Sequence, residues 1–168
     1  MNTLTVNIRR AGGEDAEAIA RIHDASWWNA YSGMIPAKAL ARMIQRRGSA
    51  WWQAAIGRHT VILLLEMQGK TAGYATIGRN RVQTLPFDGE VYELYLLPEY
   101  QGVGAGSQLF LAAMGEIRRR SLKGIVVWVL ADNQPAIRFY ENAGGRRIAE
   151  GRETFDGRDL KKICYAWD

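Results

Sequence analysis

Two repeats of apolar positions run along the chain and predict an α/β fold. A repeat of two residues marks a strand with one face buried, and a repeat of three to four residues marks one face of a helix. Strands are expected over residues 4–9, 59–67, 71–79, 90–97, 124–130, 146–151 and 161–167. Between them the longer repeat predicts about four helices, which begin near residues 14, 36, 104 and 135.

Glycine and proline set the boundaries of these elements. Pro36 and Pro135 suit helix starts, Pro98 stops a strand, and Gly48 suits a helix end. A short helical turn is also considered over Trp51–Ile56. This order of elements suits a mixed sheet of about seven strands with helices on its faces. We see no internal repeat, linker or second domain, so we expect one domain over residues 1–168.

Composition narrows the class of protein. The 168 residues are 48% hydrophobic and 23% charged, as in ordinary globular chains, and suffice for a substantial core. The single cysteine, Cys164, excludes an intrachain disulfide, and with two scattered histidines we predict no metal site. The first residues lack a basic signal segment, and the apolar run Val61–Leu65 is too short to span a bilayer. We therefore expect a cytoplasmic protein with no membrane partner.

The formal net charge of +5 leaves two interpretations open. The basic runs Arg118–Arg120, Arg146–Arg147 and Lys161–Lys162 carry much of it. Such runs are usually a solvated face, but they can also attract a polyanion. Nucleic acid is disfavoured because the basic residues are scattered and no nucleic-acid motif accompanies them.

The most informative segment, residues 93–107, predicts an anion site. A buried strand ends at Pro98, and glycines at 102, 104 and 106 open a helix. The unpaired N–H groups and partial positive charge of a helix N-terminus can hold an anion. Glycines let a phosphate approach the backbone. A glycine-rich helix cap without a ligand is the alternative.

Two familiar phosphate loops do not fit this segment. A P-loop needs a lysine directly after its glycines, whereas Lys123 lies a whole helix away. A dinucleotide fingerprint needs the spacing G-x-G-x-x-G, and this chain is one residue short. Its acidic candidate, Asp132, also lies farther on than the usual spacing of about 20 residues.

A second motif thirty residues on changes the interpretation. Residues 101–106 fit the pattern Q/R-x-x-G-x-G/A, and residues 133–144 supply Asn133, Phe139, Tyr140 and Gly144 in register. This pair, in this order, resembles the GNAT superfamily of acetyl-CoA-dependent N-acetyltransferases. The resemblance runs from the first strand to the last two strands.

The resemblance implies a fold and a cofactor site. In a GNAT-like fold the fourth and fifth strands, here 90–97 and 124–130, splay apart, and the pantetheine arm of acetyl-CoA lies in the gap. Leu94 N–H would stabilise the oxyanion, and Leu96 would hold the pantetheine amide. Asn133 would hydrogen-bond the cofactor arm, or it caps the helix at Pro135. The pyrophosphate would lie against the backbone of Gln101, Gly102, Val103, Gly104, Ala105, Gly106 and Ser107.

The resemblance also implies the catalytic groups. Tyr140 falls on the position of the general acid that protonates the leaving thiolate; the alternative is a core tyrosine. Glu93 and Glu90 are both candidates for the base, and either could instead pair with an arginine. Alternation along a strand lets only one of them face the substrate unless a bulge intervenes, and we favour Glu93. The base can also act through water.

The acceptor is the least constrained part. Trp28 and Tyr31 lie where the family's first helix walls the acceptor pocket, whereas Trp27 and His23 suit the core. Basic residues outweigh acids over residues 14–56, which disfavours a polycation and favours a small-molecule amine or a peptide N-terminus. A homodimer is left open. The rivals are a non-catalytic coenzyme A-binding regulatory domain, a nucleic-acid-binding protein, and an acyltransferase that uses a longer acyl-CoA.

Overall fold

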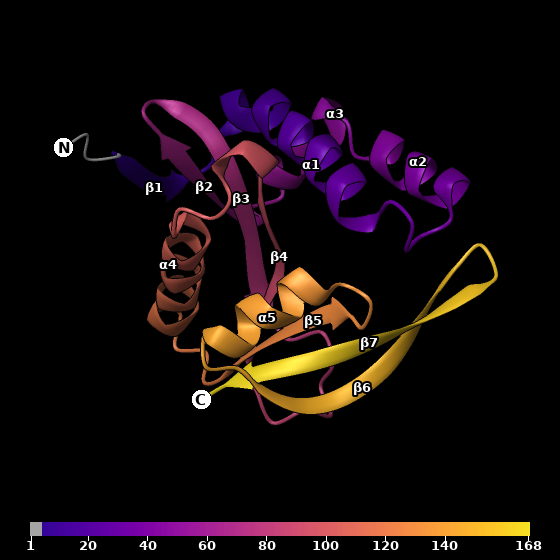
Figure 1. The fold of residues 1–168 in the computed structure, drawn as a ribbon. Helices are drawn as coiled ribbons and strands as arrows, with labels where there is room; N and C mark the ends of the chain where they lie inside the picture. Colours follow the sequence, from indigo (N-terminus) through magenta and orange to yellow (C-terminus); the bar gives the residue numbers. More distant parts are fainter. Residues whose placement is uncertain (1–4) are drawn as a thin grey trace.

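A computed structural model describes residues 5–168 as a twisted mixed sheet with helices on both faces (Figure 1). Leu4, the first position of the predicted first strand, lies outside the described residues. The strands are β1 (Val6–Arg10), β2 (Val61–Met67), β3 (Lys70–Arg79), β4 (Gly89–Leu96), β5 (Ile125–Leu130), β6 (Arg146–Phe155) and β7 (Arg158–Trp167). The helices are α1 (Ala16–Tyr31), α2 (Ala37–Arg46), α3 (Ser49–Gly57), α4 (Ala105–Arg119) and α5 (Gln134–Asn142).

The sheet is seven-stranded in the order β1-β2-β3-β4-β5-β7-β6, which confirms the predicted mixed sheet. All neighbours are antiparallel except β4 and β5. These two parallel strands pair only at Gly89 with Ile125 and at Glu90 with Val126, and then diverge. The splay expected between the fourth and fifth strands is therefore present (Figure 1).

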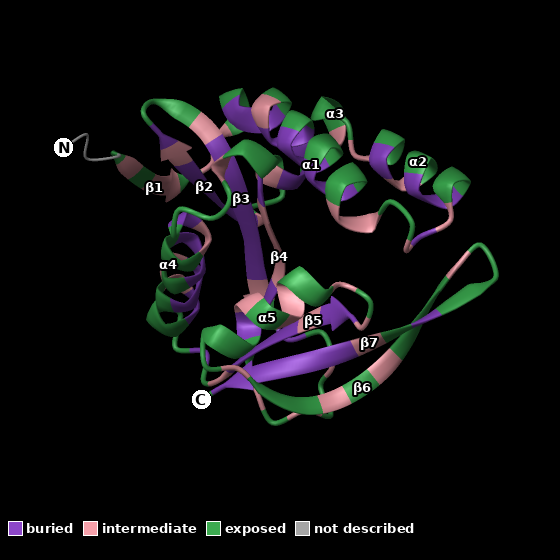
Figure 2. Cartoon of the chain, viewed as in Figure 1, coloured by how far each residue is buried: buried purple, intermediate pink, exposed green. Residues whose placement is uncertain are grey.

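Two apolar layers hold the helices against the sheet. On one face α4 and α5 pack on the sheet through Leu109, Phe110, Ile117 and Tyr140. On the other face α1 and α3 pack against β2 and β3, and α2 packs beside the ends of β5 and β7. Figure 2 shows β3, β5 and β7 buried at the centre and β6 exposed at the edge. None of the helices in residues 5–168 is both long and apolar enough to cross a membrane.

There are five helices in the described chain, one more than expected, because Ser49–Gly57 forms a complete helix rather than a single turn. Trp52 and Ala55 bury its inner face, and the Trp52 ring packs edge-on against Tyr74 at 5.1 Å. Gly48 precedes this helix as its N-cap. The two tryptophans and three alanines near this segment show no clear repeat, so burial rather than periodicity explains the helix.

The last hairpin is also longer than expected. β6 runs on to Phe155 and β7 begins at Arg158, around a two-residue turn at Asp156 and Gly157. Both turn residues have positive φ, 47° and 79°, as a tight type I′ hairpin turn requires. The extension is mostly polar and exposed, as is common at a sheet edge, so it carries little apolar alternation.

Candidate active site

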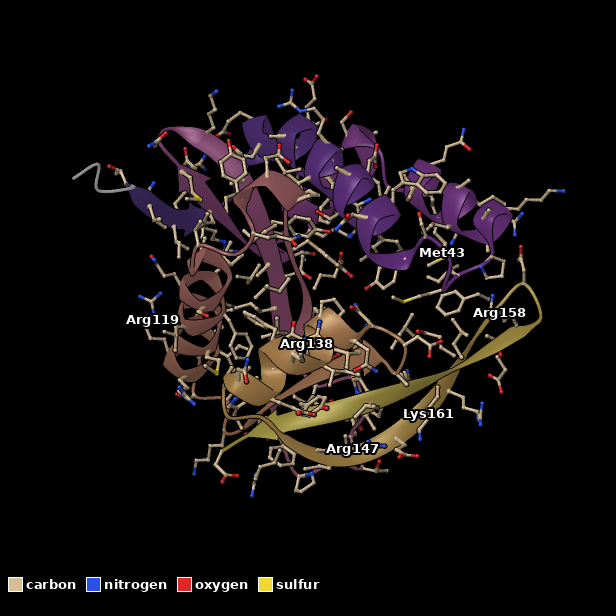
Figure 3. The ribbon with its side chains drawn as sticks, viewed as in Figure 1. Met43, Arg119, Arg138, Arg147, Arg158 and Lys161 are labelled. Carbon is tan, nitrogen blue, oxygen red and sulfur yellow. The ribbon has the colours of Figure 1, made fainter. Side chains whose placement is uncertain are left out.

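Two pockets meet where β4 and β5 diverge. The first has a volume of about 540 Å³ and lies between the glycine-rich turn, α5 and the end of α1. The second has a volume of about 280 Å³ and lies between α1, α2 and the β6–β7 hairpin, with Met43 between α2 and the hairpin (Figure 3). Tyr95 of β4 lines both pockets.

The first pocket borders the N-terminus of α4. Gly102 and Gly104 have φ of 81° and 83°, where other residues are strained, and a Cβ on either would meet no atom within 4 Å. Gly106 differs, because its Cβ would lie 3.3 Å from Leu96 and Phe139. The first two glycines therefore shape an open turn, and the third lets α4 pack closely on β4 and α5.

Most of the predicted phosphate-binding residues line this pocket. Gln101, Gly102, Gly104, Gly106 and Ser107 do so. Val103 is 52% exposed and Ala105 is buried, and neither side chain lines the pocket. The first N–H groups of an α-helix have no partner within the helix, so those of α4 are available to an anion.

The backbone of β4 presents free polar groups to the gap between the strands. Leu97 N–H donates to Ala72 O at 2.8 Å, so by alternation Tyr95 turns its polar groups toward β3 as well. Leu94 and Leu96 consequently turn theirs toward β5, which has already diverged. The Leu96 carbonyl accepts a bond from the Gln101 amide at 3.1 Å. The predicted N–H donors, Leu94 and Leu96, thus face the first pocket.

Three of the named residues of the second motif, Asn133, Phe139 and Tyr140, also line the first pocket. Asn133 caps α5, because its side-chain oxygen accepts a bond from Ala136 N–H at 3.3 Å. Tyr140 packs its ring against Phe110 and Trp167 at 5.4 and 5.9 Å. Burial, and secondarily Tyr31, raises the pKa of Tyr140, so this phenol is protonated at neutral pH. Tyr140 is therefore both a core tyrosine and a pocket residue.

A β-bulge places both candidate glutamates on one face of the sheet. Thr76 pairs with Glu93 and Ile77 pairs with Val91, so Tyr92 is an extra residue in β4. The extra residue shifts the alternation, and Glu90 and Glu93 both turn toward the face that carries Tyr74 and Tyr95. The exception anticipated from the sequence, a bulge in this strand, therefore applies, and alternation does not separate the two glutamates.

Only one of the two glutamates lines a pocket. Glu93 lines the second pocket, where it binds Arg47 Nη1 at 2.5 Å and accepts a bond from Tyr74 Oη at 2.7 Å. Glu90 is 1% exposed and binds the backbone N–H and guanidinium of Arg81, the latter at 2.7 Å. Both carboxylates pair with an arginine, and of the two only Glu93 borders a pocket.

The aromatic residues of α1 divide between core and pocket. Tyr31 lines the second pocket and shares a 2.6 Å hydrogen bond with Tyr95 Oη. Trp27 is mostly buried, as expected, but it also lines the second pocket. Trp28 is 42% exposed and lines a separate hollow beside Pro36. The structure thus brings Tyr31, but not Trp28, to Glu93.

His23 is a packed core residue, as predicted. Its ring lies 4.5 Å from that of Trp27 and 5.7 Å from that of Trp52. Burial, and then the nearby charge of Arg47, lowers the pKa of His23 to about 3. The neutral imidazole packs among aromatic rings and lines neither of the two pockets.

Several pocket residues are absent from the sequence-based expectations. They are Arg47, Arg81, Tyr95, Trp128, Glu153 and Lys162. The extended hairpin supplies two of them, and the Asp156–Gly157 turn is the signal that could have found the extension. The others come from separate elements, and no spacing in the sequence links them.

Two other kinds of site are not supported in residues 5–168. No group of three histidine, cysteine, aspartate or glutamate side chains there could hold a metal ion. Cys164 is fully buried, and burial, followed by the charge of Glu90, raises its thiol pKa to about 12. A thiol of this kind is inert as a nucleophile.

Comparison with known proteins finds similarity over most of the chain. The sequence model of the acetyltransferase (GNAT) family matches residues 23–144. An uncharacterised N-acetyltransferase, YuaI of Bacillus subtilis, is 30% identical over 162 residues, which is 96% of this chain and 92% of that protein. A mycothiol acetyltransferase of Saccharomonospora viridis is 30% identical over 79% of this chain. The chain matches only 42% of the length of that second relative.

The fold is also similar to solved structures. The PaiA N-acetyltransferase of Thermoplasma acidophilum, in complex with coenzyme A, has a TM-score of 0.73. It is 20% identical, and the similarity covers 95% of this chain and 98% of that one.

Proposed function

The chain is a member of the GNAT acetyltransferase family, and on this premise we propose that it transfers an acetyl group from acetyl-CoA to a primary amine. The amine belongs to a small molecule or is a peptide N-terminus. The observation that carries the proposal is the junction at Tyr95, where two pockets meet beside the free backbone groups of Leu94 and Leu96.

The first pocket fits acetyl-CoA, which supplies the thioester to be attacked. Its glycine-rich turn leaves space over Gly102 and Gly104, and the helix behind them offers unpaired N–H groups. The free N–H groups of Leu94 and Leu96 suit an extended ligand that continues the sheet between β4 and β5. Coenzyme A is the ligand of the similar PaiA structure.

Three groups of this chain would assist the transfer of the acetyl group. Leu94 N–H can donate to the carbonyl oxygen as negative charge develops on it. Glu93 can take a proton from the acceptor, directly or through water. Tyr140, which keeps its proton at neutral pH, can donate a hydrogen bond to the leaving sulfur. The N–C bond forms as the C–S bond breaks, and the nitrogen's proton ends on the thiol.

Transfer is direct, in a ternary complex. An enzyme-bound acetyl group would need a nucleophile in the site, and the chain's one cysteine is buried with a raised pKa. Separate pockets that meet at one residue let both substrates be present together.

The test is a panel of amines with acetyl-CoA, with release of free thiol as the readout. We expect steady-state release that depends on one class of amine, with intersecting rather than parallel double-reciprocal lines. Acetyl-CoA binding without release for any amine would support the regulatory alternative instead. Faster turnover with a longer acyl-CoA would support acyl transfer to an amine but show that acetyl-CoA is not the preferred donor.

A further inference from the structure

The second pocket holds charges that the proposed chemistry does not use. Five charged side chains line it, namely Arg47, Arg81, Glu93, Glu153 and Lys162. Arg47 pairs with Glu93, and Arg81 pairs with the buried Glu90. Within the described chain, neither Lys162 nor Glu153 has an ion-pair partner within 4 Å. One cation and one anion thus remain available to a ligand.

Both of these residues come from one face of the β6–β7 hairpin. Gly151 pairs with Lys162, and Glu153 pairs with Leu160. Glu153 is two residues beyond Gly151, so it is a diagonal neighbour of Lys162 on the adjacent strand. They point to the same side, into the pocket. The hairpin extension beyond residue 151 is what supplies Glu153.

Lys162 is held in place by its surroundings. Its ammonium lies 4.8 Å from the centre of the Trp128 ring. A Cβ on Gly151 would lie 3.2 Å from Lys162 Cε and 3.4 Å from the Trp128 ring, so this glycine leaves room for the lysine stem. The Trp128 ring and the space left by Gly151 together orient the Lys162 ammonium before a ligand binds, which reduces the entropy cost of binding.

Glu93 and Lys162 come from different walls of the pocket, β4 and the β6–β7 hairpin. Lys162 lies over the ring of Trp128, and its backbone pairs with Leu130 at the diverged end of β5. Arg81 lies over the ring of Tyr92 and binds Glu90 at the paired end of β4. Glu93 and Tyr95 are two residues apart on the same face of β4, so Glu93 lies beside the junction with the first pocket, whereas Glu153 lies near both Tyr31 and Arg81. After burial, the nearby charges of Glu93 and Glu153 help raise the pKa of Tyr31 to about 12, and Tyr31 bonds Tyr95 at that junction.

We propose that the acceptor is a small amine that also carries a carboxylate, and that Lys162 binds this carboxylate. The inference deepens the proposed acetyl transfer and depends on it. The amine end lies toward Glu93 and the junction, and the carboxylate end lies at Lys162 beside Trp128. A volume of about 280 Å³ is just below the usual range of about 300–1,000 Å³ for ligand pockets, which suits a molecule as small as an amino acid.

The experiment compares matched acceptors. Each amino acid in a panel is assayed beside its amide and its decarboxylated amine, for example leucine, leucinamide and 3-methylbutylamine. We expect the best acid to exceed its amide by about 10- to 100-fold in kcat/KM, since a charge-assisted bond is lost in the amide. Most of the difference should lie in KM, because the carboxylate is bound equally before and during the reaction.

Three variants assign the effect to Lys162. Lys162→Met keeps an unbranched stem over Trp128 and removes the charge, so the acid should lose about 10- to 100-fold in kcat/KM and the amide little. Lys162→Arg should keep the preference for the acid. Lys161→Met is the matched control, because Lys161 (labelled in Figure 3) lies on the other face of the hairpin and pairs with Glu150 at 3.1 Å. That control should behave as wild type.

The outcomes separate this inference from the proposed function. If an amide or a decarboxylated amine matches its acid, or if Lys162→Met behaves as Lys161→Met, the carboxylate site is wrong while acetyl transfer stands. If no amine of any kind releases thiol from acetyl-CoA, both proposals fail. Melting temperature and acetyl-CoA affinity, measured for each variant, identify a folding defect, and a correctly folded Lys162→Gln then repeats the test.

Discussion

Replacement of Gly104 by glutamate would test the phosphate-binding turn most directly. Gly104 has φ of 83°, and any other residue there pays about 1–2 kcal/mol of backbone strain. A new Cβ would meet no atom within 4 Å, so no steric clash adds to this cost. For a chain of this size we expect a melting temperature lower by about 2–8 °C. The variant should therefore fold.

The effect on binding is electrostatic. A carboxylate about 4 Å from a phosphate repels it by about 4 kcal/mol at an effective dielectric constant of about 20. The turn is open to solvent, so we take about half of this, which is about 30-fold in Kd. Gly104→Ala carries the same strain without the charge and should change Kd much less.

Gly144→Glu is the matched control for this variant. Gly144 has φ of 88° and, like Gly104, has no atom within 4 Å of a new Cβ, but it lines neither pocket. Calorimetry with acetyl-CoA at fixed ionic strength measures all three variants. The reasoning is refuted if folded Gly104→Glu binds acetyl-CoA as tightly as Gly104→Ala, or if Gly144→Glu weakens binding equally.

Three further predictions concern the acid, the base and the core histidine. Tyr140→Phe should lower kcat by about 10²–10⁴-fold with little change in acetyl-CoA affinity, and wild-type turnover would make Tyr140 structural only. Glu93→Gln should lower kcat by about 10²–10⁴-fold. Glu90→Gln should lower the free energy of unfolding by about 1–3 kcal/mol and leave kcat close to wild type. The reverse result would make Glu90 the base and Glu93 the structural residue. Because the pKa of His23 is about 3 when folded and about 6.5 when unfolded, stability should be highest above pH 6.5 and fall toward pH 3, by about 2 kcal/mol at pH 5. Urea unfolding at pH 7 and pH 5 checks this, and an equal pH slope in His23→Gln would contradict it.

The parts of the fold that the sequence predicts are those with strong local signals. Alternation and glycine or proline boundaries located all seven strands, and Pro135 and the 102–106 glycines located two helix starts. The polar end of β6 carried no such signal, because an exposed edge strand buries no regular face. Helix α3 was underestimated because its order comes from the burial of Trp52 against the sheet.

The two pockets of the candidate site also differ in how far the sequence predicts them. The proposed cofactor pocket depends on contiguous backbone, so a motif such as 101–106 predicts it. The proposed acceptor pocket is assembled from side chains on α1, α2, β4, β5 and the hairpin, and the Arg47–Glu93 pair joins residues 46 positions apart. The bulge at Tyr92 depends on register with β3, which one strand's sequence does not specify.

The divergence of β4 and β5 leaves two open edges in the middle of a continuous sheet. An open strand edge can recruit another chain, but here residues of α1 and α5 line the gap beside these edges. Because β5 has diverged, the backbone N–H groups of Leu94 and Leu96 have no strand partner. They should exchange with deuterium as quickly as the unpaired N–H groups of an outer strand. Acetyl-CoA should slow this exchange and raise the melting temperature, which would couple the folding stability of the protein to the cell's supply of acetyl-CoA.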